Sequence, residues 1–242
     1  MEVGDISEFG EKGLNVLKEL HDRALLRRLL DRTGFADYFS FPVEGIVQLY
    51  RAARGELILH EGETVDKLLY LVSGRARLSE SLPNGKSVLL DFPQDDYFIG
   101  EMELLGVRGV TLKMQALETC YLLALPADLC WDQLLSDVKF LRFLCVYIGN
   151  KERKKVRTIV QSHGYPLINR LADFILAASS NGQYRERNVD AAEYLGVSYR
   201  HLQQTLSDFV KKGYLEKQDH HYLLRDTAAL KRLADEMSQD RE

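Results

Sequence analysis

The chain has 242 residues, and 45% of them are hydrophobic, so it can bury one large core or two smaller ones. Its 32 Lys and Arg residues against 36 Asp and Glu give a net charge of -4, which excludes an overall basic field for nucleic acid. No apolar run approaches about 18 residues and no basic, apolar leader opens the chain, which argues against a transmembrane helix and a secretory signal. Three widely spaced cysteines favour reduced thiols, so we expect a cytoplasmic protein.

Leucines recur at helical spacing between Leu14 and Leu30, which predicts an amphipathic helix leading into the fold. From about Ile46 to Leu125 the pattern changes to six short apolar or alternating runs, separated by Gly, Pro, Asn and Asp. The runs are IVQLY, ELILH, LLYLVSG, ARLSESL, SVLLDF and CYLLALP. Asn84 and Gly85, between the fourth and fifth runs, form a strong hairpin signal. This spacing predicts an antiparallel β-roll of the jelly-roll type.

A long helix is expected over residues 127–163. Two apolar lines follow it, one through Leu134, Val138, Leu141, Cys145 and Ile148, the other through Phe140, Leu144 and Tyr147. One line can lie against the β-roll while the other contacts a second copy, as in a dimerisation helix; a helix buried within one subunit is the alternative. The basic segment KERKKVR reads as a solvated helix end. Gly164 and Pro166 then mark a boundary, which divides the chain into residues 1–126, 127–163 and 164–242.

The stretch AAEYLGVSYRHLQQTLSDFV, residues 191–210, predicts two short helices joined at Gly196. Ala192 is small where two helices cross closely, and glycine adopts the positive φ that the turn between them needs. Ser198 is expected to cap the second helix. The residues expected to face inward are Leu202, Leu206, Phe209 and Val210.

The outward face of this second helix carries candidate DNA-reading side chains. They are Ser198, Tyr199, Arg200, Gln203 and Gln204. Near the N-terminus of a recognition helix such side chains enter the major groove, where Arg can pair with guanine and Gln with adenine. The following KKGYLEKQDHHYLLR predicts a two-stranded wing, with Lys211, Lys212 and Arg225 available for phosphate. A helical hairpin packed in a core is the alternative to a winged helix-turn-helix.

The ordered combination of FIGE at residues 98–101, a long helix and the winged YLGVSYRHLQQTL segment resembles the Crp/Fnr family of bacterial transcription regulators, and within it the YeiL branch. The resemblance covers about residues 40–225. It implies an α+β fold with a cyclic-nucleotide-binding-like β-roll, a homodimer paired through its long helices, double-stranded DNA as the ligand and RNA polymerase as a partner. The recognition-helix residues differ from the Arg, Glu and Gln series that selects one well-known half-site, so the resemblance implies no target sequence.

The resemblance also implies an effector site in the β-roll. Gly100 and Glu101 match positions that hold the ribose in cyclic-nucleotide-binding members, and Thr111 matches a hydroxyl that binds the phosphate. Val110 stands where those members have an arginine, and it offers no charge-assisted hydrogen bond unless a loop shift brings in Arg108. We therefore expect a signal other than cyclic AMP. A tight turn followed by a helix-start carboxylate is the alternative interpretation of Gly100 and Glu101.

The sequence gives less support to an iron–sulfur cluster, a redox-active thiol, a metal site or an enzyme. An iron–sulfur cluster needs about four thiolates. Cys120 and Cys145 fit apolar patterns as packed thiols, and Cys130, beside Trp131, is the best redox candidate. His60 lacks the converging ligands of a cupin-type metal site, so we expect neither a metal nor an enzyme. A ligand-sensing or protein-interaction module without direct DNA reading is the alternative to a DNA-binding regulator.

Overall fold

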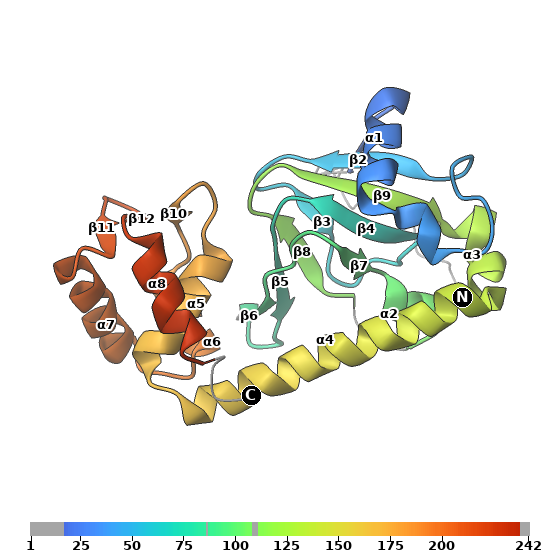
Figure 1. The fold of residues 1–242 in the computed structure, drawn as a ribbon. Coiled ribbons are helices and arrows are strands. Elements are labelled where there is room, and N and C mark those ends of the chain that lie inside the picture. The colour runs from blue at the N-terminus through green and yellow to red at the C-terminus, as the bar shows by residue number, and fades with distance from the viewer. Residues whose placement is uncertain (1–16, 86, 108–110, 238–242) are drawn as a thin grey trace, which may run out of the picture.

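The computed structural model describes residues 17–85, 87–107 and 111–237. An N-terminal β-roll and a C-terminal helical domain lie on the same side of one long helix, α4 (Val138–Gly164) (Figure 1). The β-roll lies over the N-terminal half of α4, and the C-terminal domain lies at its other end. Within the described ranges, no helix is long and apolar enough to cross a membrane.

Two antiparallel sheets make up the β-roll, which confirms the predicted fold class. The first has the strand order β1-β2-β9-β4-β7 and the second has the order β3-β8-β5-β6. The strands are β1 (Lys18–Glu19), β2 (Gln48–Ala52), β3 (Leu57–Leu59), β4 (Lys67–Ser73), β5 (Ala76–Ser81), β6 (Ser87–Asp91), β7 (Tyr97–Ile99), β8 (Lys113–Ala116) and β9 (Cys120–Pro126). All six predicted runs contain a strand. The sequence patterns predict neither β7 nor β8. The short helix α2 (Glu101–Leu104) agrees with the alternative interpretation of Gly100 and Glu101, a tight turn followed by a helix-start carboxylate.

The first described residues form a strand rather than a helix. β1 pairs with β2, and the helix α1 (Arg23–Thr33) begins only after Asp22. The carboxylate of Asp22 sets this start, because it accepts a hydrogen bond from Leu25 N at 2.9 Å. The helix predicted from Leu14 to Leu30 is therefore wrong before Asp22, and its first three residues lie outside the described part of the chain.

Strand β4 is buried on both faces, which explains its uninterrupted apolar sequence. Leu68 and Tyr70 belong to a core that also contains Phe140 of α4. Leu69 belongs to a second core, between the two sheets, together with Met114. Neighbouring side chains of this one strand thus pack in two different hydrophobic cores.

The segment predicted as one long helix is two helices, α3 (Ala127–Ser136) and α4. Asp137 separates them with an extended backbone conformation, at φ -82° and ψ 96°. Its carboxylate accepts hydrogen bonds from Phe140 N at 3.2 Å and from Ser40 N at 2.6 Å. The first bond caps α4, and the second ties the break to the segment before β2.

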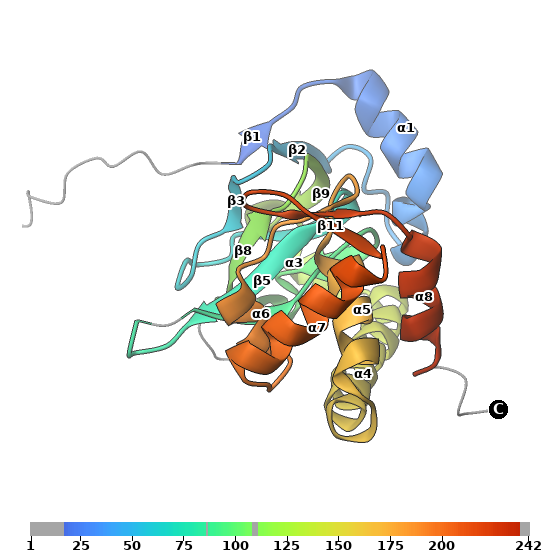
Figure 2. The ribbon, with the colours of Figure 1, turned by 90° about the vertical axis from the view of Figure 1, so that its left-hand side faces the viewer.

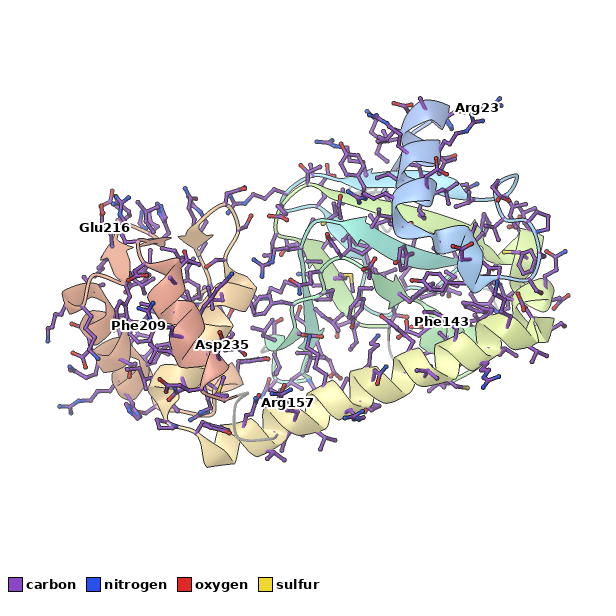
Figure 3. All side chains as sticks on the ribbon, in the orientation of Figure 1. Arg23, Phe143, Arg157, Phe209, Glu216 and Asp235 are labelled. Atoms are coloured by element: carbon purple, nitrogen blue, oxygen red, sulfur yellow. The ribbon has the colours of Figure 1, made fainter. Side chains whose placement is uncertain are left out.

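One of the two apolar lines predicted on α4 lies against the β-roll. Phe140 and Leu144 are 0% and 1% exposed, and the hydroxyl of Tyr147 accepts a hydrogen bond from Phe98 N at 2.8 Å. Figure 3 shows Phe143 extending from α4 toward the roll. This contact fixes the rotation of α4 about its own axis.

The other predicted line is divided between two helices: Leu134 lies in α3 and is 0% exposed, whereas the members on α4 are half-buried or exposed. Val138 has 78% of its surface accessible, and Cys145 is also exposed. The expectation that Cys145 is a packed thiol is therefore wrong, because the β-roll contacts the opposite side of the helix.

The C-terminal domain is a winged helix-turn-helix. Its elements are α5 (Leu167–Ala178), β10 (Gln183–Tyr184), α6 (Asn188–Tyr194), α7 (Tyr199–Lys211), β11 (Leu215–Lys217), β12 (Tyr222–Leu224) and α8 (Thr227–Asp235). The three strands form one sheet in the order β10-β12-β11. The sequence patterns predict neither β10 nor α8, which packs against α5. Figure 2 shows α6 and α7 toward the viewer, at the end of the molecule opposite α3.

Candidate nucleic-acid interface

A turn over residues 195–198 joins the two helices of the motif. Gly196 has a φ of 64°, and its N–H donates to the carbonyl oxygen of Glu193 at 3.1 Å. A residue with a Cβ is strained at this φ, which explains the glycine. Ala191 and Ala192, at 0% and 4% exposure, allow α6 to approach its neighbours closely. The predicted hinge at Gly196 is present in the structure.

Helix α7 is held in place by one buried face. Leu202, Leu206 and Phe209 are 0%, 1% and 0% exposed. Figure 3 shows Phe209 among the side chains between the helices of this domain. Ser198 caps the helix as predicted, because its Oγ accepts a hydrogen bond from His201 N at 3.2 Å. The cap and the buried face together determine which side chains α7 presents to solvent.

Four side chains predicted to read DNA share the outward surface of α7. Tyr199 is 51% exposed, and Arg200, Gln203 and Gln204 are exposed as well. Nε2 of Gln203 donates to the hydroxyl of Tyr199 at 2.7 Å, and Nε2 of Gln204 donates to Asp208 Oδ1 at 3.2 Å. The structure therefore brings these predicted residues together on one surface, next to the capping Ser198.

The two lysines predicted to bind phosphate lie at the other end of α7. Lys211 follows Tyr199 by twelve residues, which corresponds to about 18 Å along an α-helix. Nζ of Lys211 lies 3.4 Å from Asp208 Oδ1, and Nζ of Lys212 lies 6.0 Å from the centroid of the Tyr214 ring. They flank the reading surface rather than belonging to it.

Two arginines near the wing, Arg185 and Arg187, were missed by the sequence patterns. Arg225 was expected to be available for phosphate, but its guanidinium bonds to Glu216 Oε2 at 2.6 and 2.7 Å. A hollow of about 260 Å³ instead opens between the wing, the start of α6 and Gln203. The basic side chains that line it are Arg185, Arg187, Lys217, His220 and His221. The sequence YRERN, residues 184–188, which leads into α6, could have indicated Arg185 and Arg187 as basic candidates.

The three residues predicted to hold an effector line a cavity of about 420 Å³ in the β-roll. Gly100 has a φ of 90°, and a Cβ there would lie 2.8 Å from Val65 Cγ1 and 2.9 Å from the carbonyl oxygen of Lys67. The backbone therefore requires glycine at this position. Glu101 is only 4% exposed, and its carboxylate forms an ion pair with Lys151 of α4.

The described lining of the cavity is mixed, because Asp91, Glu103, Glu152 and Lys155 accompany its apolar side chains. The hydroxyl of Thr111 donates to the carbonyl oxygen of Glu63 at 2.6 Å, so it has a partner within the chain. Val110 and Arg108, on which the prediction about a cyclic phosphate depends, lie outside the described residues. Apolar side chains form much of the wall, including Leu59, Leu78, Leu90, Ile99 and Met114. The described wall of the cavity is therefore largely apolar, with charged side chains among its lining residues.

The buried cysteines are poor redox sensors. Cys120 and Cys130 are 0% and 2% exposed, and burial raises the pKa of the first thiol to about 12 and of the second to about 11. Both thiols therefore stay protonated at neutral pH, and protonated thiols react slowly. In the part of the chain that the structure describes, no group of three or more His, Cys, Asp or Glu residues is placed to hold a metal ion.

Comparisons with known proteins match both parts of the fold. Residues 49–137 match the Cyclic nucleotide-binding domain family, and residues 169–233 match the Crp-like helix-turn-helix domain family. Regulatory protein YeiL of Escherichia coli O157:H7 is 39% identical over 208 residues, which cover 86% of this chain and 95% of that protein.

Solved structures show the same architecture. A CRP-family transcriptional regulator from Thermus thermophilus has a TM-score of 0.59 at 21% identity, covering 76% of this chain and 95% of its own. A CRP/FNR-family transcriptional regulator from the same organism has a TM-score of 0.61 at 20% identity, covering 77% of this chain and 98% of its own. Together with the relative of 39% identity, they confirm the resemblance seen in the sequence. The chain belongs to the Crp/Fnr family of transcription regulators, with a helix-turn-helix DNA-binding domain.

Proposed function

We propose that the protein acts as a homodimer that reads a two-fold symmetric DNA site with the N-terminal half of α7. The observation that carries this proposal is the outward surface of α7, whose opposite face is fixed in the core. Arg200, Gln203 and Gln204 can form bidentate hydrogen bonds with guanine or adenine in the major groove. Lys211, Lys212 and Lys217, which lines the wing hollow, flank this surface and supply phosphate contacts.

An exposed strip on α4, which shares only Val138 and Cys145 with the predicted line, supports the pairing of two copies. Its members are Val138, Cys145, Gly149, Val156 and Val160, which follow one another at steps of seven and four. Such steps place side chains on one side of an α-helix, and here that side is opposite Phe140 and Leu144. The three valines are 78%, 58% and 50% exposed. The same strip of a second copy covers this surface if the two α4 helices pair about a two-fold axis.

We infer that the controlling signal is not cyclic AMP. The carboxylate of Glu101, which would hold the ribose, is already paired with Lys151 inside the roll. A ribose hydroxyl would have to separate this buried ion pair, which is costly because it leaves a buried charge without its partner. The apolar wall of the cavity favours a different class of effector.

The remaining parts of the proposal follow from the relatives. The matched structures are named transcriptional regulators, which favours RNA polymerase as a partner on DNA and the cytoplasm as the place of action. In this scheme residues 1–126 form the sensory unit, residues 127–163 the dimerisation unit and residues 164–242 the DNA-binding unit.

Selection of binding sites from a random DNA pool with the purified full-length protein tests the proposal. We expect two-fold symmetric sites with half-site centres about 10 base pairs apart, and an affinity that falls steeply with added salt. Recovery of all sequences with equal efficiency would contradict sequence reading. Selection of a single half-site without symmetry would contradict the dimer.

A further inference from the structure

Two arginines, Arg77 of strand β5 and Arg75 immediately before it, connect the β-roll to the DNA-binding domain. Nη1 of Arg77 donates to Glu186 Oε2 at 2.7 Å, and Nη2 donates to Asp190 Oδ2 at 2.9 Å. Two residues earlier, Arg75 donates to two backbone carbonyl oxygens at the C-terminal end of α5. Figure 1 shows β5 and β6 at the end of the roll nearest α5 and α6. The start of β5 and the residue before it therefore contact both α5 and the first helix of the helix-turn-helix motif.

The ion pairs of Arg77 are largely shielded from solvent. The side chains of Arg77, Glu186 and Asp190 are 18%, 6% and 5% exposed. Burial raises the pKa of Glu186, and the charge of Arg77 opposes that rise. Burial also acts to raise the pKa of Asp190, but hydrogen bonds from Arg187 and Arg77 hold it below its usual value. Removing Arg77 would leave Glu186 as a buried carboxylate without this partner.

Both carboxylates lie where they determine the position of α6. Glu186 precedes α6 by two residues, and Asp190 lies in its first turn. Arg187 donates to the other oxygen of Asp190 at 2.6 Å, so this carboxylate is held from two sides. Because the short turn at Gly196 joins α6 to α7, a restraint on α6 is also a restraint on α7.

The same hairpin also forms part of the effector cavity. Leu78, which follows Arg77, and Leu90 of β6 line the cavity, because successive side chains of a strand point to opposite faces. Leu89, which precedes Leu90 on β6, is instead buried in the core of the DNA-binding domain. Phe92, beyond the end of β6, contacts Phe174 of α5, with 5.5 Å between their ring centroids. The cavity wall and the contact surface for the DNA-binding domain are therefore opposite faces of one hairpin.

We propose that Arg77 is a positioning residue for DNA binding: by holding Glu186 and Asp190, it fixes the direction of α7 relative to α4. The proposal rests on the proposed DNA-reading function. In a dimer, both α7 helices must enter the major groove at a set spacing, so a loosely held domain must be ordered on binding, with a loss of affinity. Tyr199 is 51% exposed while Arg77 is bound, so the contact orients the reading surface and does not cover it.

The first experiment compares the full-length variants Arg77→Ala and Arg54→Ala on the DNA site that the wild-type protein selects. Arg54 is an exposed arginine in the turn before β3 and serves as the matched control. We expect Arg77→Ala to bind at least about ten-fold more weakly, and Arg54→Ala to stay within about two-fold of the wild type. The slope of log affinity against log salt should not change, because no phosphate contact is lost. The DNA affinity of Arg77→Lys should lie between those of the wild type and Arg77→Ala, because an ammonium group cannot bind two carboxylates with the fixed geometry of a guanidinium.

Hydrogen exchange supplies a second readout, which does not need DNA. Amides of α6 should exchange faster in Arg77→Ala, while amides of β4 and α4 keep wild-type protection. Glu186→Gln removes one charge with little change of shape, and it should weaken DNA binding in the same direction. This variant keeps the test decisive if Arg77→Ala does not fold.

Equal DNA affinity of the wild type and Arg77→Ala would overturn the proposal, and so would tighter binding by the variant. Unchanged exchange in α6 would overturn it as well. A wild-type protein that selects no DNA would overturn the proposed function, whereas exchange in α6 would still decide whether Arg77 restrains that helix.

Discussion

Gln203 donates a hydrogen bond from Nε2 to the hydroxyl of Tyr199, one turn earlier on α7, over a distance of 2.7 Å. The bond holds two long side chains in one arrangement, which lowers the side-chain entropy that DNA binding would otherwise cost. Arg200 extends from the same exposed surface. The reading surface is therefore ordered at Tyr199 and Gln203 before any base is present.

Tyr199→Phe removes the hydroxyl and releases the amide of Gln203. We expect affinity for the selected site to fall about two- to ten-fold, because a hydrogen bond contributes about 0.5–1.5 kcal/mol. Competition with sites altered at single base pairs identifies the position that loses its preference. Tyr121→Phe, in β9 of the roll, is the matched control. Equal losses in the two variants would show that the bond on α7 has no special role.

Arg200→Ala should leave folding and dimerisation intact and reduce discrimination among DNA sequences. The expected loss is about 1–3 kcal/mol at one position of each half-site, since one bidentate contact disappears. Lys211→Ala is the informative comparison, because loss of a phosphate contact weakens binding to all sequences and lowers the salt slope by about one. Unchanged selectivity in Arg200→Ala would reject its base-reading role.

Cys145→Glu should shift the protein from dimer to monomer. Two carboxylates would meet across the strip on α4, where they repel each other and lose solvent. Sedimentation equilibrium measures the mass, and Leu129→Glu, at another exposed apolar position, controls for the added charge. Cys145→Ser should remain dimeric, because the thiol itself is not required. A wild-type protein that is monomeric at high concentration would exclude pairing through α4.

Asp137→Ala should lower the free energy of unfolding at pH 7 by about 1–2 kcal/mol, because the N–H groups of Phe140 and Ser40 lose their acceptor. Burial acts to raise the pKa of Asp137, but hydrogen bonds from Ser40 and the first turn of α4 hold it below its usual value. A carboxyl with a depressed pKa stabilises the fold at neutral pH, and this contribution is lost as pH falls below about 4. In urea unfolding, the difference between wild type and variant should therefore shrink in acid. If the difference in the free energy of unfolding stayed constant from neutral pH to acid, the ionised carboxylate of Asp137 would not be the stabilising group.

Cyclic AMP at about 1 mM should leave the Tm of the purified protein unchanged, because only a ligand that binds the folded state raises its stability. We expect no binding because the carboxylate of Glu101, which would hold the ribose, is already paired with Lys151. Lys151→Ala frees this carboxylate and shows whether the ion pair is what prevents binding. An increase in Tm for the wild-type protein would refute the inference about the signal.

Sequence patterns predicted those parts of the fold whose signals are local. Gly196 and Ser198 act within one turn of the chain, through a positive φ and a capping hydrogen bond, so their neighbours suffice to identify them. The long β4 run was also visible, because burial on both faces leaves an unbroken apolar stretch. By contrast, β7 and β8 have three and four residues, which is too short to show a period.

Contacts between distant parts of the chain could not be predicted. Lys151 and Glu101 are 50 positions apart, and Arg77 and Glu186 are 109 positions apart. No neighbouring residue of Arg77 indicates which carboxylate it meets, because the pairing depends on how the roll and the DNA-binding domain fit together. The pair of Arg225 and Glu216 is closer in sequence, at nine positions, but it depends on the register of β11 against β12, which the sequence patterns did not predict.

Strand β4 places Leu69 and Tyr70 in separate interiors, and this arrangement makes its length critical. An insertion of one residue would turn each following side chain to the opposite face. The strand would stay apolar, so solvent exposure would not reveal the error, but the hydroxyl of Tyr70 would lose Asp96, to which it donates at 2.6 Å. The fold can therefore tolerate apolar substitutions in β4, but it cannot tolerate the insertion of a single residue there.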